Sequence, residues 1–164
     1  MEFAVRKSVQ SDLEEIMRVY SSARAFMRAH DNPTQWIGYP TEETVKNDME
    51  SSNGYVVTYD GVICGVFAFF TAPDPTYAVI EDGSWINDAP YGTVHRVASD
   101  GKHRGVLAFV MSYCSEMIPN IRIDTHADNY VMQNALAKLG FEKRGIIHLA
   151  DGSPRIACQK IFSK

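Results

Sequence analysis

The stretch YGTVHRVASDGKHRGVLAFVMSYCSEM, residues 91–117, decides the fold. Its first part is rich in β-forming residues and predicts a strand over 91–99. From Val106 onward the apolar residues recur at helical spacing, which predicts a helix from about residue 104 to 117. A strand that leads directly into a helix is the first half of a parallel crossover unit.

The turn between this strand and helix is Gly-Lys-His-Arg-Gly, residues 101–105, and it carries cations where a helix does not favour them. A helix N-terminus has roughly half a positive charge and several unpaired N–H groups. Lys102 and Arg104 therefore disfavour the helix unless an anion lies between them. The turn predicts a phosphate site.

The bulk properties indicate one globular domain over residues 1–164, since the chain has 164 residues and is 45% hydrophobic. A net charge of -4 argues against the broad basic face of a nucleic-acid or membrane-surface binder. The longest apolar run, 62–70, is shorter than the roughly 20 residues that span a bilayer, and no signal segment is visible. Cys64, Cys114 and Cys158 fit small core residues in a reducing compartment. We expect a cytoplasmic protein.

On the N-terminal side, the sequence predicts a strand at 3–6 and then two helices. Ser11 and Glu14 have the spacing of a capping box for the first helix, which should end before residue 32. Thr41 is the expected N-cap of the second helix.

An antiparallel hairpin is expected next, because the β-forming runs 55–59 and 62–70 are separated by Asp60-Gly61. The following segment, 72–90, has three prolines and no sustained period, so it is predicted to be a long loop. Long loops inside compact domains are often functional.

On the C-terminal side, we expect a strand at 121–125, a helix from about 129 to 139, and two final strands about Asp151-Gly152. Asp128 is the expected N-cap of this helix, and Gly140 stands where a left-handed C-cap belongs.

Two segments together resemble the GNAT superfamily of acyl-CoA N-acyltransferases, and the order of elements matches over essentially the whole chain. The first is His95-Arg-Val-Ala-Ser99 followed by Lys102-His-Arg-Gly105-Val-Leu107; the second runs from Ile121 to Asn129 and ends at Gly140-Phe141. The resemblance implies an α/β fold of the α+β type: a mixed, mostly antiparallel central sheet, splayed between strands 4 and 5 and flanked by about four helices.

The resemblance also implies acetyl-CoA as co-substrate, without a metal. The backbone of 97–99 would contact the pantetheine arm in the gap between strands 4 and 5, and the amides of 103–107 would hold the pyrophosphate beside Lys102 and Arg104. Asn129 and Gln133 would follow the arm. The implied cofactor contacts are Val97, Ala98, Ser99, Lys102, His103, Arg104, Gly105, Val106, Leu107, Asn129 and Gln133.

Each of these roles has a plainer alternative. Lys102 and Arg104 would then be solvated, Asn129 would lie beside a capping Asp128, and Gln133 would be a surface residue. The chain also departs from the family pattern. Lys102 replaces a Gln or Arg, Leu107 replaces a small residue and would crowd the pyrophosphate, and Leu136 replaces the frequent general-acid tyrosine.

Amide synthesis requires a base, because the attacking amine must lose a proton. His95 and Glu81 are the candidates; the alternatives are a packed strand histidine and a solvated loop acid. For the acceptor, Trp36, Tyr39 and Trp85 could form an aromatic pocket for a cationic amine, with acids nearby at Asp31, Glu81, Asp82 and Asp88. Aromatic anchoring of the loops is the alternative.

The leading hypothesis is an acyltransferase for acyl groups other than aminoacyl groups, here an acetyl-CoA-dependent N-acetyltransferase. It would acetylate a primary amine of a small molecule or peptide by direct attack in a ternary complex. A non-catalytic acyl-CoA sensor is the rival, because of Leu107 and Leu136. A kinase-like phosphate binder is disfavoured, because Gly105 is not followed by Lys-Ser/Thr. A homodimer paired through the final strands stays open.

Overall fold

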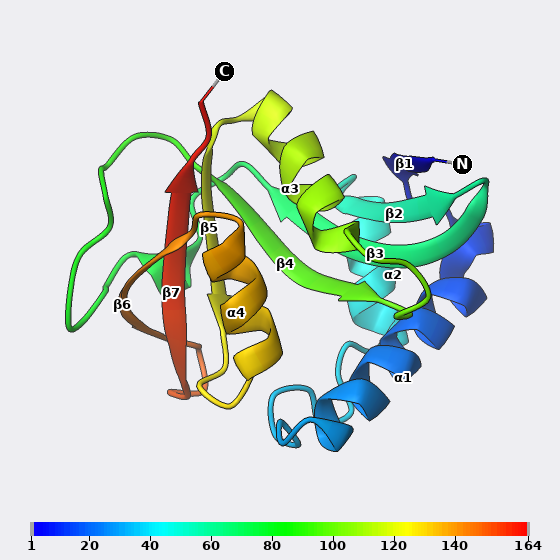
Figure 1. Cartoon of the computed structure of the whole chain (residues 1–164), viewed down its shortest axis with the longest axis horizontal. Coiled ribbons are helices and arrows are strands. Elements are labelled where there is room, and N and C mark those ends of the chain that lie inside the picture. Colours follow the sequence, from blue (N-terminus) through cyan, green and yellow to red (C-terminus); the bar gives the residue numbers. More distant parts are fainter. Residues whose placement is uncertain (1, 164) are drawn as a thin grey trace. The chain divides into compact units, whose positions relative to one another are not determined.

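The computed structural model describes residues 2–163. In chain order its elements are β1 (Phe3–Lys7), η1 (Gln10–Asp12), α1 (Leu13–Ala29), α2 (Glu42–Glu50), β2 (Gly54–Tyr59), β3 (Val62–Phe70), η2 (Pro75–Tyr77), β4 (Gly92–Ser99), α3 (Val106–Met117), β5 (Asn120–Thr125), α4 (Tyr130–Lys138), β6 (Glu142–His148) and β7 (Pro154–Ile161). Figure 1 labels the α-helices and the strands. The predicted strands and helices are all present, with ends shifted by a few residues.

The strands form one mixed sheet with the order β1-β2-β3-β4-β5-β7-β6. β1 with β2, β2 with β3, β5 with β7 and β6 with β7 pair antiparallel. β4 and β5 pair in parallel, at Gly92 with Ile121 and at Thr93 with Arg122. With its four α-helices among residues 2–163, this confirms the predicted fold class.

The chain divides into two compact units. The first unit holds the chain up to Phe69 together with His95–Tyr113, and the second holds Phe70–Val94 together with the chain from Cys114 onward. β4 therefore begins in the second unit and ends in the first.

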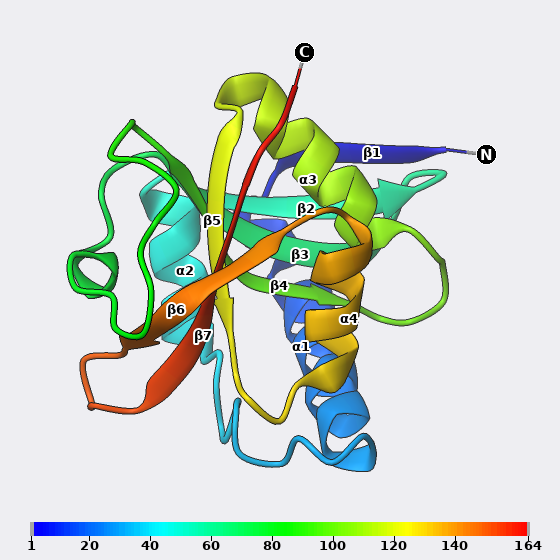
Figure 2. The ribbon, with the colours of Figure 1, turned by 60° about the vertical axis from the view of Figure 1, so that its left-hand side comes forward.

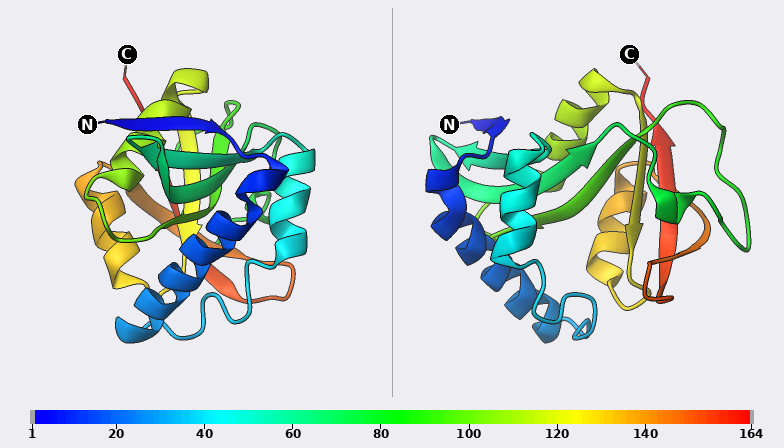
Figure 3. Two further views of the ribbon diagram at one scale, coloured as in Figure 1. Left: turned by 90° about the vertical axis from the view of Figure 1, so that its right-hand side faces the viewer. Right: turned by 180° about the vertical axis from the view of Figure 1, so that it is seen from behind.

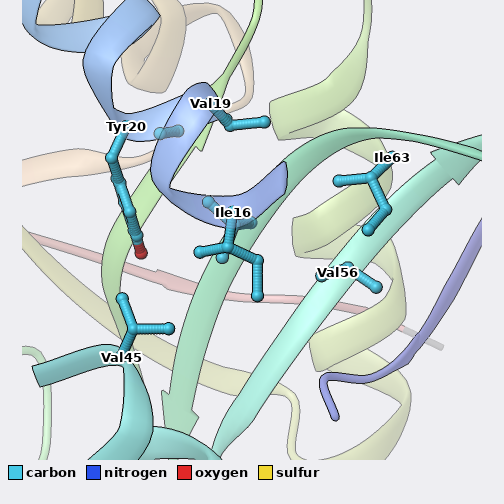
Figure 4. Packing of buried hydrophobic residues seen from close by; sticks show 8 residues of the cluster. Ile16, Val19, Tyr20, Val45, Val56 and Ile63 are labelled. Carbon is cyan, nitrogen blue, oxygen red and sulfur yellow. The ribbon is translucent and has the colours of Figure 1, made fainter. Parts of the chain in front are cut away.

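The core of the first unit lies where α1 and α2 cover β2 and β3 (Figures 3 and 4). Ile16, Val19 and Tyr20 have the i, i+3, i+4 spacing of one helix face and are fully buried. Val45 of α2, Val56, Ile63, Val66 and Ala98 complete the cluster. Burial of this stripe, rather than helix propensity, holds α1 in place.

Local signals explain most boundaries in the first unit. The Thr41 hydroxyl accepts the Thr44 N–H and caps α2, as predicted. Asp60 and Gly61 both have positive φ, 50° and 85°, as the two-residue hairpin turn requires. The predicted capping box of Ser11 and Glu14 is wrong, because α1 begins after a short 3-10 turn in which the Asp12 carboxylate accepts the Val9 N–H at 2.9 Å.

In the second unit, β7 lies between β5 and β6 (Figure 2). Tyr77, Ile147 and Ala157 form its buried cluster, with Trp85 and Tyr91 packed against it. The predicted long loop is thus folded against the sheet. It also contains η2, and at Glu81 its backbone exchanges two hydrogen bonds of 2.8 Å with Ile146 of β6.

The ends of α4 are partly as predicted. Gly140 has φ 89°, and its N–H and that of Phe141 bond to the carbonyls of Ala137 and Leu136, which closes the helix as expected. The predicted N-cap, Asp128, is wrong by one residue: the Asn129 side chain accepts the Met132 N–H at 3.0 Å. Both residue types are good caps, so the turn preceding the helix decides between them.

Candidate active site

The turn between β4 and α3 lies at an open surface of the first unit. Gly101 and Gly105 have φ values of 78° and 86°, a backbone conformation that favours glycine. A Cβ at Gly101 would meet no atom within 4 Å, and one at Gly105 would meet only the Phe3 ring, at 4.0 Å. Lys102 and Arg104 are exposed at the same turn. Backbone and cations are therefore accessible together.

The start of α3 adds further features that favour a negative group. The Phe109 N–H bonds to the Gly105 carbonyl at 3.0 Å, so the amides just before it have no acceptor within the helix. The first turn of α3 contains no acidic residue. The free amides, the helix dipole and the two cations all favour a negative group.

The predicted contacts of the pantetheine arm, Val97, Ala98 and Ser99, lead directly into this turn. Ala98 is buried in the core of the first unit. The Asp100 N–H bonds to the Cys64 carbonyl at 2.9 Å, which ties the end of β4 to β3. The Ser99 hydroxyl accepts the Gly101 N–H, and the Asp100 carboxylate accepts the Lys102 N–H. The turn is preformed by its own side chains.

His103, Val106 and Leu107, the remaining predicted contacts of the turn, use their side chains differently. The His103 ring stacks on Tyr59, with ring centres 3.9 Å apart, and meets the Phe3 ring edge-on. Val106 is buried and Leu107 is half-buried. His103 and Val106 would therefore contact a ligand through their backbones rather than their side chains.

Asn129 and Gln133 belong to the second unit, and both are buried. The Gln133 amide donates to the carbonyls of His126 and Ala127, at 3.2 and 2.9 Å, and accepts from Lys143 Nζ at 3.1 Å. The alternative of a surface glutamine is wrong, because the residue is only 8% exposed. The two residues shape the turn that precedes α4, and their contact with a cofactor stays a prediction.

The two candidate bases lie in different surroundings. His95 is half-buried in β4, beside Arg96, whose φ of 51° interrupts the regular alternation of the strand. A regular strand would place the side chains of His95 and Val97 on one face, and the conformation of Arg96 between them removes that inference. Glu81 is exposed, and its backbone is anchored to Ile146.

Arg96 is the centre of a partly buried network that sequence reasoning missed. Its Nε and Nη2 donate to the Asp48 carboxylate at 2.9 and 2.6 Å, and its Nη1 donates to the Tyr39 hydroxyl at 3.1 Å. The Tyr20 hydroxyl donates to the Arg96 carbonyl at 2.7 Å. Burial lowers the pKa of the Arg96 guanidinium, but Asp48 and Tyr39 outweigh this effect and raise it overall. One signal was visible: Asp48 lies on the apolar face of α2, between Val45 and Met49.

Trp36 and Tyr39 lie in the loop between α1 and α2, residues 30–41. The Trp36 ring packs edge-on against Tyr20, with centres 5.6 Å apart, and also meets Tyr39. Ile37 between them is 75% exposed. The loop is thus held by its aromatic residues, while one large apolar side chain faces outward.

Trp85, the third aromatic residue predicted to bind the acceptor, is engaged inside the second unit. Its indole N–H donates to the Tyr77 carbonyl at 2.9 Å, and the Arg122 guanidinium lies 4.1 Å from its ring centre. This anchors the loop between η2 and β4. A role of Trp85 in acceptor binding stays a prediction.

Within residues 2–163, no three or more His, Cys, Asp or Glu side chains are placed to hold a metal ion. None of the helices there has both the length and the apolar character to cross a bilayer.

No protein-family model and no curated protein matches the chain. Among solved structures, an acetyltransferase of the GNAT family from Streptococcus agalactiae is 30% identical, covers 99% of this chain and 96% of its own, and superposes with a TM-score of 0.88. The ribosomal-protein-S18-alanine N-acetyltransferase from Escherichia coli is 15% identical, with coverage of 99% and 96% and a TM-score of 0.64. Ard1 from Thermoplasma volcanium is 17% identical over 100% of both chains, with a TM-score of 0.65. The last two show the fold alone, whereas the streptococcal protein is also related in sequence.

Proposed function

This chain belongs to the GNAT family of acetyltransferases, and we propose that it transfers the acetyl group of acetyl-CoA to a primary amine of a small molecule or peptide. The observation that carries the proposal is the turn from Gly101 to Gly105. Its backbone is accessible and adopts positive φ at two glycines, and it carries two exposed cations. It leads into the N-terminus of a helix that has no acidic residue in its first turn.

The residues present fit coenzyme A. The amides at the start of α3 would hold the pyrophosphate, and Arg104 and Lys102 would supply charge, with Arg104 better suited to bidentate contact. Leu107 is half-buried, so its side chain is partly withdrawn from the surface of the turn. When bound, acetyl-CoA supplies an activated thioester to the amine.

Direct transfer is favoured over an acyl-cysteine mechanism. Burial raises the pKa of the Cys114 thiol to about 12 and that of Cys158 to about 11, and it also raises the pKa of Cys64. All three are buried free thiols. Since the thiolate is the nucleophilic form, none of them is suited to attack a thioester.

The proton on the amine would pass to His95 or Glu81, either directly or through water. Leu136 stands at the usual place of the general-acid tyrosine, is 1% exposed and carries no proton to donate. The leaving thiolate would therefore take its proton from water or from another group.

The acceptor would lie beside Trp36 and Tyr39. Aromatic faces attract cationic amines, whether small amines or peptide amino groups. The Escherichia coli protein with this fold is named for acetylation of a protein alanine, which supports including peptides among the acceptors tested.

The experiment combines calorimetry with acetyl-CoA and a free-thiol assay over a panel of small and peptide amines. Binding together with amine-dependent thiol release is expected. Binding without release for any amine would favour the non-catalytic sensor, and the absence of both would overturn the proposal.

A further inference from the structure

We propose that Arg96 is a positioning residue that docks the loop of residues 30–41 onto β4, and that this docking sets the affinity for the acceptor amine. This assignment rests on the proposed function, because that function places the acceptor beside Trp36 and Tyr39. It goes further by naming the interaction that holds both of them.

One residue connects four parts of the first unit. The Arg96 side chain donates hydrogen bonds to Asp48 of α2 and to Tyr39 of the loop. Its main-chain carbonyl accepts a hydrogen bond from the Tyr20 hydroxyl of α1. Its side chain is 16% exposed and that of Asp48 is 11% exposed, so the ion pair is well shielded from water. A shielded, bidentate pair of this kind has a defined geometry, unlike a surface ion pair.

Both aromatic residues of the loop are fixed through Arg96, by different routes. Tyr39 is held directly, by the hydrogen bond between its hydroxyl and the guanidinium. Trp36 packs on the Tyr20 ring, whose hydroxyl is bonded to the main-chain carbonyl of Arg96, and it also meets the Tyr39 ring edge-on. Trp36 is thus linked to the guanidinium through Tyr39. A change at the ion pair therefore affects both rings of the proposed acceptor site.

The backbone of Arg96 supports the same conclusion. A φ of 51° is uncommon for any residue with a side chain, and such a conformation persists where its surroundings determine it. Here the side chain and the carbonyl are both bound. His95, a candidate base, directly precedes Arg96 in β4. The loop of residues 30–41 is therefore hydrogen-bonded to the same strand that carries His95.

The test compares two bidentate arginine–aspartate pairs of the first unit. Asp48→Asn removes the charge beside Arg96. Asp12→Asn does the same beside Arg6, whose nitrogens lie 2.8 and 3.0 Å from the carboxylate, away from the acceptor loop. For each variant we would measure the acceptor KM, kcat, the Kd of acetyl-CoA by calorimetry, and the emission of Trp36 in a Trp85→Phe background used for fluorescence only.

Asp48→Asn should raise the acceptor KM about tenfold, the loss expected for one weakened charge-assisted interaction, with kcat and the acetyl-CoA Kd within about twofold of wild type. The Trp36 emission should shift to the red, because the ring loses part of its packing. Asp12→Asn should leave the acceptor KM and the emission unchanged. If Asp48→Asn does not fold, Tyr39→Phe removes a single hydroxyl and should give the same pattern at smaller amplitude.

An unchanged acceptor KM and unchanged emission in a folded Asp48→Asn protein would overturn the proposal. So would an equal loss of acetyl-CoA affinity, or an equal effect of Asp12→Asn. A wild-type protein that acetylates no amine would instead refute the proposed function. The Trp36 emission and hydrogen exchange of residues 30–41 would then still decide whether Arg96 docks the loop.

Discussion

The Arg122 guanidinium lies 3.9 Å from the centre of the Tyr91 ring, and it also lies 4.1 Å from the centre of the Trp85 ring. Arg122 is only 4% exposed, and its Nη2 donates to the Asn87 carbonyl at 2.9 Å. Its Nε has no hydrogen-bond partner among residues 2–163. Burial lowers the pKa of this guanidinium, which shows that removing the charge from water is unfavourable. The stacking on the two rings offsets part of that unfavourable free energy.

Replacing Arg122 separates these two effects. Arg122→Ala should lower the free energy of unfolding by about 2–4 kcal/mol, because it leaves a cavity between two rings. Arg122→Met keeps the apolar stem and removes the buried charge with its unpaired Nε, so a loss below about 1 kcal/mol is expected. Chemical denaturation measures both. An equal loss of unfolding free energy in the two variants would mean that the charge of Arg122, rather than the space that its side chain fills, stabilises this cluster.

Arg104→Glu tests the placement of the cofactor with two effects of opposite sign. An acidic side chain at the N-terminus of α3 interacts favourably with the helix dipole. The free protein should therefore be as stable as wild type, or more stable by about 0.3–1 kcal/mol. Affinity for coenzyme A should fall about tenfold or more, while a pantetheine fragment without phosphates should bind as before. Calorimetry and thermal unfolding give both values.

The control for this variant is Lys138→Glu, which reverses an exposed cation in the last turn of α4. It should lower stability, since an acid is unfavourable at a helix C-terminus, and leave coenzyme A affinity unchanged. Equal loss of coenzyme A and of the fragment in Arg104→Glu would show that Arg104 does not contact the phosphates.

The ion pair of Asp12 predicts a dependence of stability on pH. The hydrogen bonds from Arg6, with that from the Val9 N–H, lower the pKa of Asp12 below its ordinary value of 3.8 despite burial. The folded state then binds fewer protons than the unfolded state. The stabilisation is present in full well above pH 3.8 and is lost as the pH falls through the folded pKa.

Asp12→Asn should therefore be less stable than wild type by about 1 kcal/mol at pH 6, with the exposure of Arg6 limiting the effect, and the difference should shrink towards pH 3. Urea denaturation at several pH values measures it. Glu15→Gln is the control, because its pair with Arg18 is exposed and contributes little. A deficit in Asp12→Asn that is constant from pH 6 to pH 3 would contradict the ion pair as its cause.

Features that depend on neighbouring residues could be predicted from the sequence. Thr41 before α2, the Asp60-Gly61 turn and the Gly140 cap each follow from local geometry, and all three are present. Asp12 shows the limit of this approach, because a carboxylate that bonds both Val9 and Arg6 moved the helix start away from the predicted box.

Features that join distant residues could not be predicted in this way. Arg96 and Asp48 are 48 positions apart, and nothing near either residue identifies its partner. Gln133 is a polar residue of a kind common on helix surfaces, yet it is buried. Burial is tolerated because its side-chain amide donates to the carbonyls of His126 and Ala127 and accepts from the Lys143 ammonium. The charged turn was predicted, since its residues are contiguous; the network around Arg96 was not.

The pH profile of kcat/KM tests the two candidate bases, since this parameter reports ionisation in the free enzyme. Glu81→Gln and His95→Gln each remove a titrating group and retain a polar side chain of similar length. The limb that reports the base should vanish in the variant that lacks it, and kcat should fall about 100-fold or more there. The other variant should keep the limb. Glu81 is backbone-bonded to Ile146 whatever its side chain, so Glu81→Gln should leave thermal stability unchanged and any kinetic loss would be chemical. A limb retained in both variants would exclude both residues as the base and leave water or the acceptor amine itself to carry the ionisation.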